Sequence, residues 1–247
     1  MIGLPKRKKN TKYLISLFLI LISFTTFFIM YKYYVEGEKN IPFNISKLIV
    51  ISSAETQNFE KNDNTYQADV VQKNDIYIGI EKNKNYKEED AIKKIIFNNF
   101  TITKPGKKGN IKIYRSATTD KPFEYIESYE IKNSVEYMGA KNTNLKQEKM
   151  TISNQGGLIE LSALIKDLGK ITYTENENLV SDGTLINKLN LNNEEIKTQI
   201  SFDMLMELQS GKTFKTTITL ELPTGDIQTE GVCTNEIDLS KLVFKRV

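Results

Sequence analysis

The residue types that most often carry out catalysis are scarce in this sequence. Its 247 residues include no histidine and a single cysteine, Cys233. Without histidine the chain cannot form a Ser–His–Asp or Cys–His catalytic group, and it cannot hold a histidine-ligated zinc ion. One cysteine cannot form an internal disulfide or a cysteine metal cluster. We therefore predict neither a cofactor nor a metal site, and we interpret Cys233 as a small buried apolar residue.

Two short motifs that contain Gly, Lys or Ser are only weak evidence for a phosphate-binding or catalytic site. Gly211-Lys212-Thr213 matches the end of a phosphate-binding loop, but that loop needs a glycine five residues earlier, where Met206 stands. The motif also lies between two predicted strands, whereas a phosphate-binding loop leads into a helix. We therefore predict a hairpin turn there. Ser52 and Ser53 would form a Ser–Lys catalytic pair only with a lysine beside them in space, which the sequence does not reveal.

Charged side chains leave further possibilities open. The 31 Asp and Glu residues allow a glycan hydrolase that uses a pair of carboxylates. The acidic loop 175–182 lacks the spacing of a calcium-binding loop, so we expect a solvated turn. Lys104, Lys107 and Lys108 surround a Pro-Gly pair, which predicts a charged hairpin tip that discourages edge pairing of strands. A contact with an anionic polymer is the second interpretation of these lysines.

The first 32 residues differ from the rest of the chain. Tyr13 to Tyr31 are 19 consecutive residues without a charge. A helix of that length spans roughly 28 Å, close to the thickness of a bilayer's hydrocarbon core. A buried soluble helix rarely runs so far without a charge. A cleaved signal peptide has a shorter apolar core that ends in small residues, whereas this segment ends in Met30-Tyr31-Lys32. We predict an uncleaved transmembrane helix.

The flanks of this segment predict its orientation. Five cations and no acid precede the helix, and a nearly balanced mixture of charges follows it. The positive-inside rule therefore places the N-terminus in the cytoplasm and everything after Lys32 outside the membrane. The residues that we expect to determine this topology are Lys6, Arg7, Lys8, Lys9 and Lys12.

Alternating apolar and polar residues after the helix predict half-buried strands. The clearest are 200–208 and 214–222, which Ser210-Gly211-Lys212 joins into an antiparallel hairpin. The acidic start and the apolar spacing of Lys87–Phe97 predict one helix. Leu164–Leu168 fits either a helix or a strand, and we favour a strand. The other expected strands are Phe43–Ser52, Tyr66–Gln72, Ile76–Ile80, Phe100–Lys104, Ile111–Tyr114, Glu124–Tyr129, Lys149–Ser153, Leu158–Lys166, Ile227–Gly231 and Leu242–Lys245.

These elements predict a mainly β fold. We expect a single transmembrane helix followed by an antiparallel β-sandwich-like extracytoplasmic region with one short helix. The polar stretch Ala140–Lys149 suggests a division into two β-rich lobes rather than one large sandwich. The expected parts are a basic cytoplasmic tail (1–12), the transmembrane helix (13–31), a membrane-proximal lobe (33–139) and a sandwich-like distal lobe (140–247).

Charge and composition lead to a functional hypothesis. Residues 1–32 hold six cations and no anion, whereas residues 33–247 hold 28 Lys and Arg against 31 Asp and Glu. We predict a non-enzymatic, membrane-anchored module for binding or scaffolding on a bacterial cell surface. The alternatives are a carboxylate-dependent hydrolase of cell-envelope glycans, and an accessory subunit of a transport or secretion complex that acts through its span. The expected partners are the membrane and either an envelope protein or an anionic cell-wall polymer. Nucleic acid is not expected outside the membrane.

Overall fold

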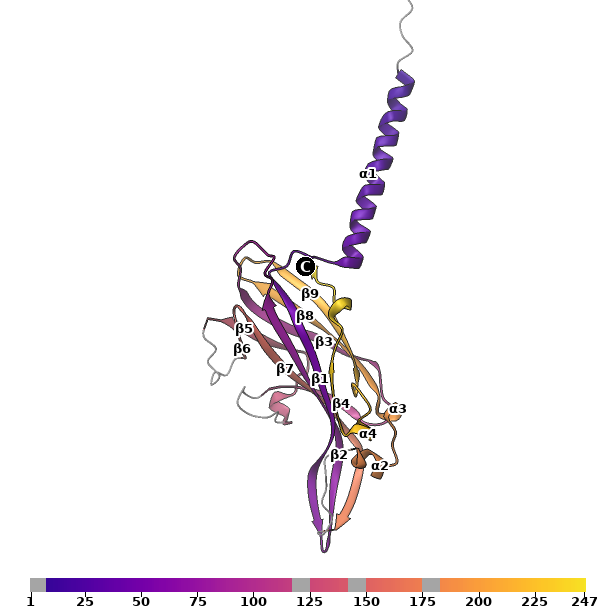
Figure 1. The fold of residues 1–247 in the computed structure, drawn as a ribbon, viewed down its shortest axis with the longest axis vertical. Coiled ribbons are helices and arrows are strands. Elements are labelled where there is room, and N and C mark those ends of the chain that lie inside the picture. Colours follow the sequence, from indigo (N-terminus) through magenta and orange to yellow (C-terminus); the bar gives the residue numbers. More distant parts are fainter. Residues whose placement is uncertain (1–7, 117–124, 142–149, 175–182) are drawn as a thin grey trace, which may run out of the picture.

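The chain folds into a long N-terminal helix followed by two β-sheets (Figure 1). The computed structural model describes residues 8–116, 125–141, 150–174 and 183–247. Sheet A has the strand order β10-β1-β2-β7-β4, and sheet B has the order β11-β9-β8-β3-β5-β6. The elements are α1 (Lys8–Glu36), β1 (Phe43–Asn62), β2 (Thr65–Lys82), β3 (Ile92–Lys104), β4 (Asn110–Arg115), η1 (Glu127–Tyr129), β5 (Ser134–Ala140), β6 (Thr151–Ser153), β7 (Gly156–Thr174), α2 (Thr184–Lys188), α3 (Asn193–Ile196), β8 (Thr198–Leu208), β9 (Thr213–Leu222), α4 (Ile227–Glu230), β10 (Val232–Glu236), η2 (Leu239–Lys241) and β11 (Lys245–Arg246).

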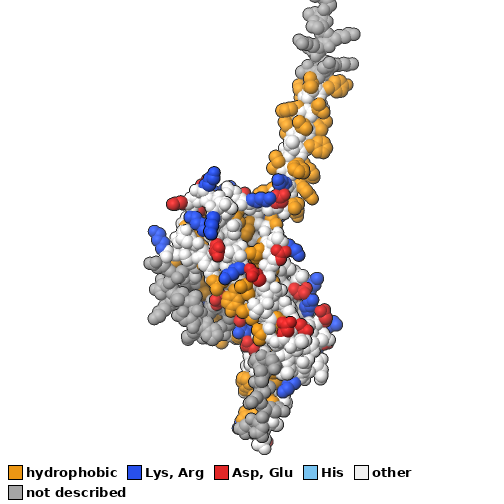
Figure 2. All heavy atoms as spheres, in the orientation of Figure 1, with side chains coloured by type: hydrophobic (Ala, Val, Ile, Leu, Met, Phe, Trp, Pro, Cys, Tyr) orange, Lys and Arg blue, Asp and Glu red, His pale blue; other side chains and the backbone are white. Residues whose placement is uncertain are grey.

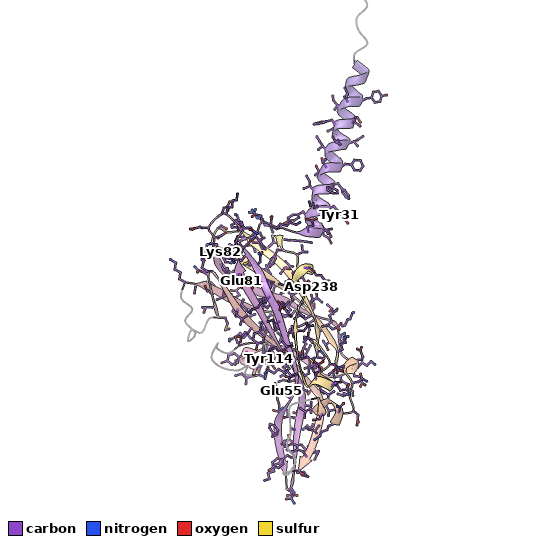
Figure 3. The ribbon with its side chains drawn as sticks, in the orientation of Figure 1. Tyr31, Glu55, Glu81, Lys82, Tyr114 and Asp238 are labelled. Atoms are coloured by element: carbon purple, nitrogen blue, oxygen red, sulfur yellow. The ribbon has the colours of Figure 1, made fainter. Side chains whose placement is uncertain are left out.

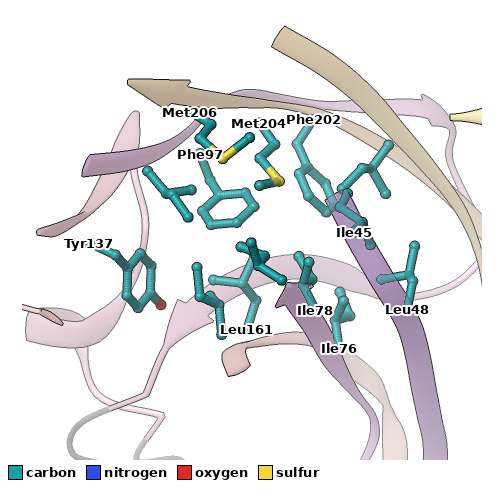
Figure 4. Packing of buried hydrophobic residues seen from close by; sticks show 14 of the residues in the cluster. Ile45, Leu48, Ile76, Ile78, Phe97, Tyr137, Leu161, Phe202, Met204 and Met206 are labelled. Atoms are coloured by element: carbon teal, nitrogen blue, oxygen red, sulfur yellow. The ribbon is translucent and has the colours of Figure 1, made fainter. Parts of the chain in front are cut away.

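The two sheets pack face to face around one large apolar core, which confirms the predicted mainly β, sandwich-like fold. Alternation along each strand turns its apolar side chains inward. Burying each large apolar side chain contributes about 1.5–3 kcal/mol, so this core is the main source of stability. Its central residues include Ile45, Leu48, Ile76, Ile78 and Leu161 from sheet A and Phe97, Tyr137, Phe202, Met204 and Met206 from sheet B (Figure 4).

Three strands of sheet A extend well beyond sheet B. Strands β1, β2 and β7 contain 20, 18 and 19 residues, whereas β8 and β9 contain 11 and 10. A second apolar cluster covers their inner face, where short helices α2, α3 and α4 replace sheet B. Beyond these helices the strands form a narrow ribbon that points away from α1 (Figure 1). The second cluster includes Ala54, Val70, Ile165, Ile171, Leu185, Ile186, Ile196 and Ile227.

The predicted helix at Lys87–Phe97 is wrong, because strand β3 begins at Ile92. The register of β3 against β8 shifts between Ile92 and Lys94, where one extra residue is inserted. This bulge lets Ile92 and Ile95 both face the core although they are three residues apart. Such spacing imitates a helical pattern.

Other predicted elements also differ from the structure. Ile227–Gly231 is helix α4 and a glycine rather than a strand, because the Asp226 side chain caps the helix and Gly231 ends it at φ 75°. The described end of Glu124–Tyr129 is the turn η1. Within Leu242–Lys245 only Lys245 is in a paired strand. The hairpin of β8 and β9 and the strand at Leu164–Leu168 are confirmed.

The two expected lobes, 33–139 and 140–247, interleave in both sheets. Strand β2 pairs with β7, and β3 pairs with β8, so strands from each side of the expected boundary lie next to each other. Residues 142–149 themselves lie outside the described residues. The alternation of side chains locates strands but does not indicate which distant strands pair.

Candidate functional site

Helix α1 is long and apolar enough to cross a membrane over Tyr13–Glu36. None of its most apolar window is buried against the sandwich, so it is not the core helix of a soluble domain. Lys8, Lys9 and Lys12 lie in the first turns of α1, whereas Lys6 and Arg7 lie outside the described residues. The topological role of these five residues stays a prediction.

The junction between α1 and the sandwich is short and tightly packed. Gly37 ends the helix with a positive φ of 68°, a conformation that favours glycine. A Cβ at this position would lie 2.3 Å from the carbonyl oxygen of Phe244. The next amide, that of Glu38, donates a hydrogen bond of 2.7 Å to the same oxygen. The chain thus passes from α1 to β1 through a short connection, residues 37–42, whose first residues pack and hydrogen-bond against Phe244.

The last strand of the sandwich also contacts the helix. The amide of Arg246 donates to the Tyr33 hydroxyl oxygen at 2.9 Å. The Lys245 ammonium lies 4.1 Å from the centre of the Tyr34 ring, which is a close cation–π contact. These contacts fix the end of α1 against the C-terminus of the chain.

The outer face of sheet A holds a half-buried group of charged side chains. Lys73 on β2 contacts Glu55 on β1 at 3.5 Å and Asp75 on its own strand at 3.2 Å. Ser53, which faces Lys73 across the strand pair, donates to Glu55 at 3.2 Å. Burial opposes the charge on Lys73, but the two carboxylates outweigh it and raise its pKa. The two carboxylates therefore favour the protonated form of Lys73.

A hydrogen-bonded chain continues from this group to a tyrosine that covers the sheet. Ser162 on β7 donates to Asp75 at 2.8 Å, and its oxygen lies 3.1 Å from the Tyr125 hydroxyl. Burial raises the pKa of Asp75, although Lys73 and Ser162 partly offset that effect. Tyr125 stacks edge-on against Tyr114 of β4 at 5.2 Å. These contacts hold the segment from Tyr125 onward against the sheet.

Toward α1 the same face carries partly exposed apolar residues with acids beside them. Tyr77 on β2 stands between Ile49 on β1 and Glu160 on β7, and Ile49 in turn faces Glu236 on β10. Ile51 lies next along β1, and its side chain is also half-buried. Figure 2 shows hydrophobic side chains in the middle of the sandwich with charged side chains around them. We call Ile49, Ile51, Tyr77, Glu160 and Glu236 the acid-rimmed patch.

The outer face of sheet B is different, because its charges pair with each other. Lys215 contacts Asp203 at 2.7 Å, and Lys197 contacts Glu221 at 2.7 Å. Glu207 similarly accepts from Lys93. Neutralised charges and threonines make this a solvated face. By contrast, no ion pair involves Glu160 or Glu236 among the described residues.

The structure separates the residues that the sequence singled out. Cys233 is buried, which confirms the prediction of a small buried residue, and burial together with Glu230 raises its pKa to about 11. Ser52 and Ser53 are both buried, and they lie on opposite faces of sheet A. Lys212 sits at the predicted hairpin turn and contacts Glu88 at 2.9 Å.

Two further expectations from the sequence concern loops. Lys104 ends β3 in sheet B and β4 begins in sheet A, so Lys104–Lys108 crosses between the sheets and is not a hairpin tip. The crossing follows from strand pairing, which local sequence does not encode. The acidic loop 175–182 lies outside the described residues.

Sequence reasoning missed the acid-rimmed patch, although one signal was available. Leu48, Ile49, Val50 and Ile51 form an unbroken apolar run. Since alternate residues of a strand face opposite sides, such a run predicts apolar groups on the outer face as well as in the core. Which acids surround the run depends on strand register, and that was not predictable.

No protein-family model, curated protein or solved structure matches this chain.

Proposed function

We propose that this protein is a single-pass membrane-anchored module whose β-sandwich lies outside the cytoplasm and binds or scaffolds other envelope components. The observation that carries the proposal is α1, an exposed apolar helix joined to the sandwich by a short, hydrogen-bonded connection. The five cations before the uncharged segment Tyr13–Tyr31 support a cytoplasmic N-terminus. Binding is supported by the contrast between the two outer faces. Among the described residues, only the outer face of sheet A combines partly exposed apolar groups with acids outside any ion pair.

The anchoring proposal is tested by extraction of membranes at alkaline pH. We expect the full chain to stay with the membrane pellet, because an apolar span holds it there. A variant with Leu17, Leu19 and Leu21 replaced by Asp should enter the soluble fraction, since charges at the centre of a span are costly. Release of the unaltered chain would contradict the proposal.

A carboxylate-dependent hydrolase is the first alternative. Such an enzyme needs two carboxyl groups on opposite sides of the bound sugar. Glu55 and Asp75, two acids on the outer face of sheet A, instead share Lys73 between them. This arrangement supports binding over hydrolysis as the proposal. Release of reducing sugar from cell-wall glycan by the protein, and its loss in an Asp75→Asn variant, would favour the enzyme.

An accessory subunit that acts through its span is the second alternative. It predicts that the identity of the apolar residues in Tyr13–Tyr31 matters, whereas a simple anchor needs only their length and apolarity. Replacing the segment with an unrelated apolar helix of equal length discriminates the two. We expect membrane location and partner binding to survive, and their loss would favour the accessory subunit.

A further inference from the structure

We propose that the acid-rimmed patch of sheet A binds a protein surface whose apolar side chains are surrounded by Lys and Arg. This inference rests on the proposed binding function and names the chemistry of the partner. The patch lies on the outer face of four neighbouring strands, β10, β1, β2 and β7. Of these, β1, β2 and β7 continue into the ribbon that projects away from α1 (Figure 1).

The apolar part of the patch supplies the contact area. Ile49, Ile51 and Tyr77 are neighbours on two paired strands, and each is only partly buried. Leu158 and Val232 extend the apolar surface on β7 and β10, and these side chains are 50% and 51% exposed. A tyrosine surrounded by aliphatic groups on a rigid sheet is a favourable anchor, because little side-chain entropy is lost on binding.

The charges around the patch select the partner. Four carboxylates surround its apolar groups and two lysines accompany them, so the face is negative overall. One of these lysines, Lys73, already contacts Glu55 and Asp75. Lys47 lies across Gly79 at the margin nearest α1. A partner with basic side chains would therefore meet Glu160 and Glu236, the two acids without an ion pair among the described residues. The four carboxylates belong to Glu55, Asp75, Glu160 and Glu236.

The same charges exclude two other occupants. A second copy of this face would place carboxylates opposite carboxylates, so symmetric self-association through the patch is disfavoured. An anionic wall polymer would likewise meet Glu160 and Glu236 and be repelled.

Figure 3 shows how labelled residues of sheet A lie along the molecule. Glu81 and Lys82 lie at the end of the sheet near α1, whereas Glu55 and Tyr114 lie nearer the ribbon.

The test uses the full chain in nanodiscs of zwitterionic lipid and three short synthetic peptides. One peptide alternates Lys with Leu, the second alternates Glu with Leu, and the third alternates Lys with Ser. A photo-crosslinking residue replaces Tyr77 in one preparation and Thr219 of β9, on the outer face of sheet B, in another. We expect only the Lys–Leu peptide to bind well, and to crosslink at position 77 rather than 219.

Charge reversal supplies the specificity control. The double variant Glu160→Lys, Glu236→Lys should weaken binding of the Lys–Leu peptide by about tenfold or more and reverse the preference toward the Glu–Leu peptide. The milder pair Glu160→Gln, Glu236→Gln should give an intermediate loss, which guards against misfolding of the first variant. A Thr219→Lys control should leave binding unchanged.

Three results would overturn the inference. They are equal binding of the Lys–Leu and Glu–Leu peptides, unchanged binding after charge reversal, and crosslinking that favours position 219. Failure of the anchoring proposal is a separate result, because α1 would then not insert into the nanodisc although the patch still bound its peptide in detergent.

Discussion

Asn74 joins three buried polar groups inside the sandwich. Its amide oxygen accepts hydrogen bonds from Ser52 at 2.7 Å and Gln72 at 3.1 Å, and its amide nitrogen donates to the backbone of Ala163 at 3.0 Å. All four residues are buried in the inner face of sheet A. Buried polar groups are costly without partners, so Asn74 allows the two other polar side chains to remain inside.

Replacing Asn74 by Ala should therefore lower the free energy of unfolding by about 1–3 kcal/mol, because Ser52 and Gln72 lose their common acceptor. Denaturant unfolding measures the change. Asn235→Ala, at an exposed position of the edge strand β10, is the control and should have little effect. Equal stability of the Asn74 variant and the unaltered protein would show that the buried network contributes nothing.

We predict that Asp203 on β8 contributes to the stability of the fold and that this contribution is lost in acid. Burial opposes its charge, but hydrogen bonds from Lys215, Thr217 and Asn99 outweigh that effect and lower its pKa. A lowered folded pKa means that the contribution is complete above the unfolded value of 3.8 and is lost as the pH falls through the folded value. The unaltered protein should lose more stability between about pH 5 and pH 2 than an Asp203→Asn variant does.

Unfolding curves across that pH range measure this difference. Asp63→Asn, in the exposed turn between β1 and β2, is the control and should follow the unaltered protein. Parallel pH profiles for the Asp203 variant and the unaltered protein would contradict the assignment.

At the level of elements, we predict that the junction of α1 with the sandwich depends on the glycine at position 37. Gly37 and Gly211 both have positive φ, 68° and 81°, but only Gly37 has a backbone atom where a Cβ would stand. Gly37→Ala should open the junction, since strain and the clash with Phe244 act together. Gly211→Ala should incur only the smaller conformational strain.

Hydrogen exchange of the Glu38 amide reports this opening, because that amide donates across the junction. Exchange should accelerate in the Gly37 variant and stay unchanged in the Gly211 variant. Equal exchange in both variants would mean that the junction tolerates a side chain at Gly37.

The elements that the sequence predicted best depend on local pattern. The hairpin of β8 and β9 follows from an alternation that only Leu205 interrupts and from a Gly-Lys turn, and α1 follows from its long uncharged run. Strand β3 was misread because its bulge at Ile92 breaks the alternation. Pairings such as β2 with β7 are long-range, and the chemistry of the outer face depends on them. The sequence alone therefore does not predict the acid-rimmed patch, because only the register of β2 and β7 places Glu160 beside Tyr77.

At the scale of the whole molecule, α1 and the ribbon of β1, β2 and β7 lie at opposite ends of the sandwich (Figure 1). If α1 spans the membrane, the ribbon is the part farthest from it. Phe59, near the ribbon's turn, is 60% exposed. Behind it Tyr66 and Tyr173 stack with ring centres 5.4 Å apart, which stiffens the ribbon. The overall arrangement is an exposed apolar helix at one end and a β-sandwich that extends from it.

Cysteine labelling in intact cells tests whether α1 anchors the chain with its N-terminus in the cytoplasm. In a Cys233→Ser background, Phe59→Cys reports the ribbon and Thr11→Cys reports the N-terminal side of the span. With a membrane-impermeant maleimide, we expect Cys at position 59 to be labelled in intact cells and Cys at position 11 only after the cells are opened. Labelling of position 11 in intact cells, or of position 59 only after lysis, would contradict it.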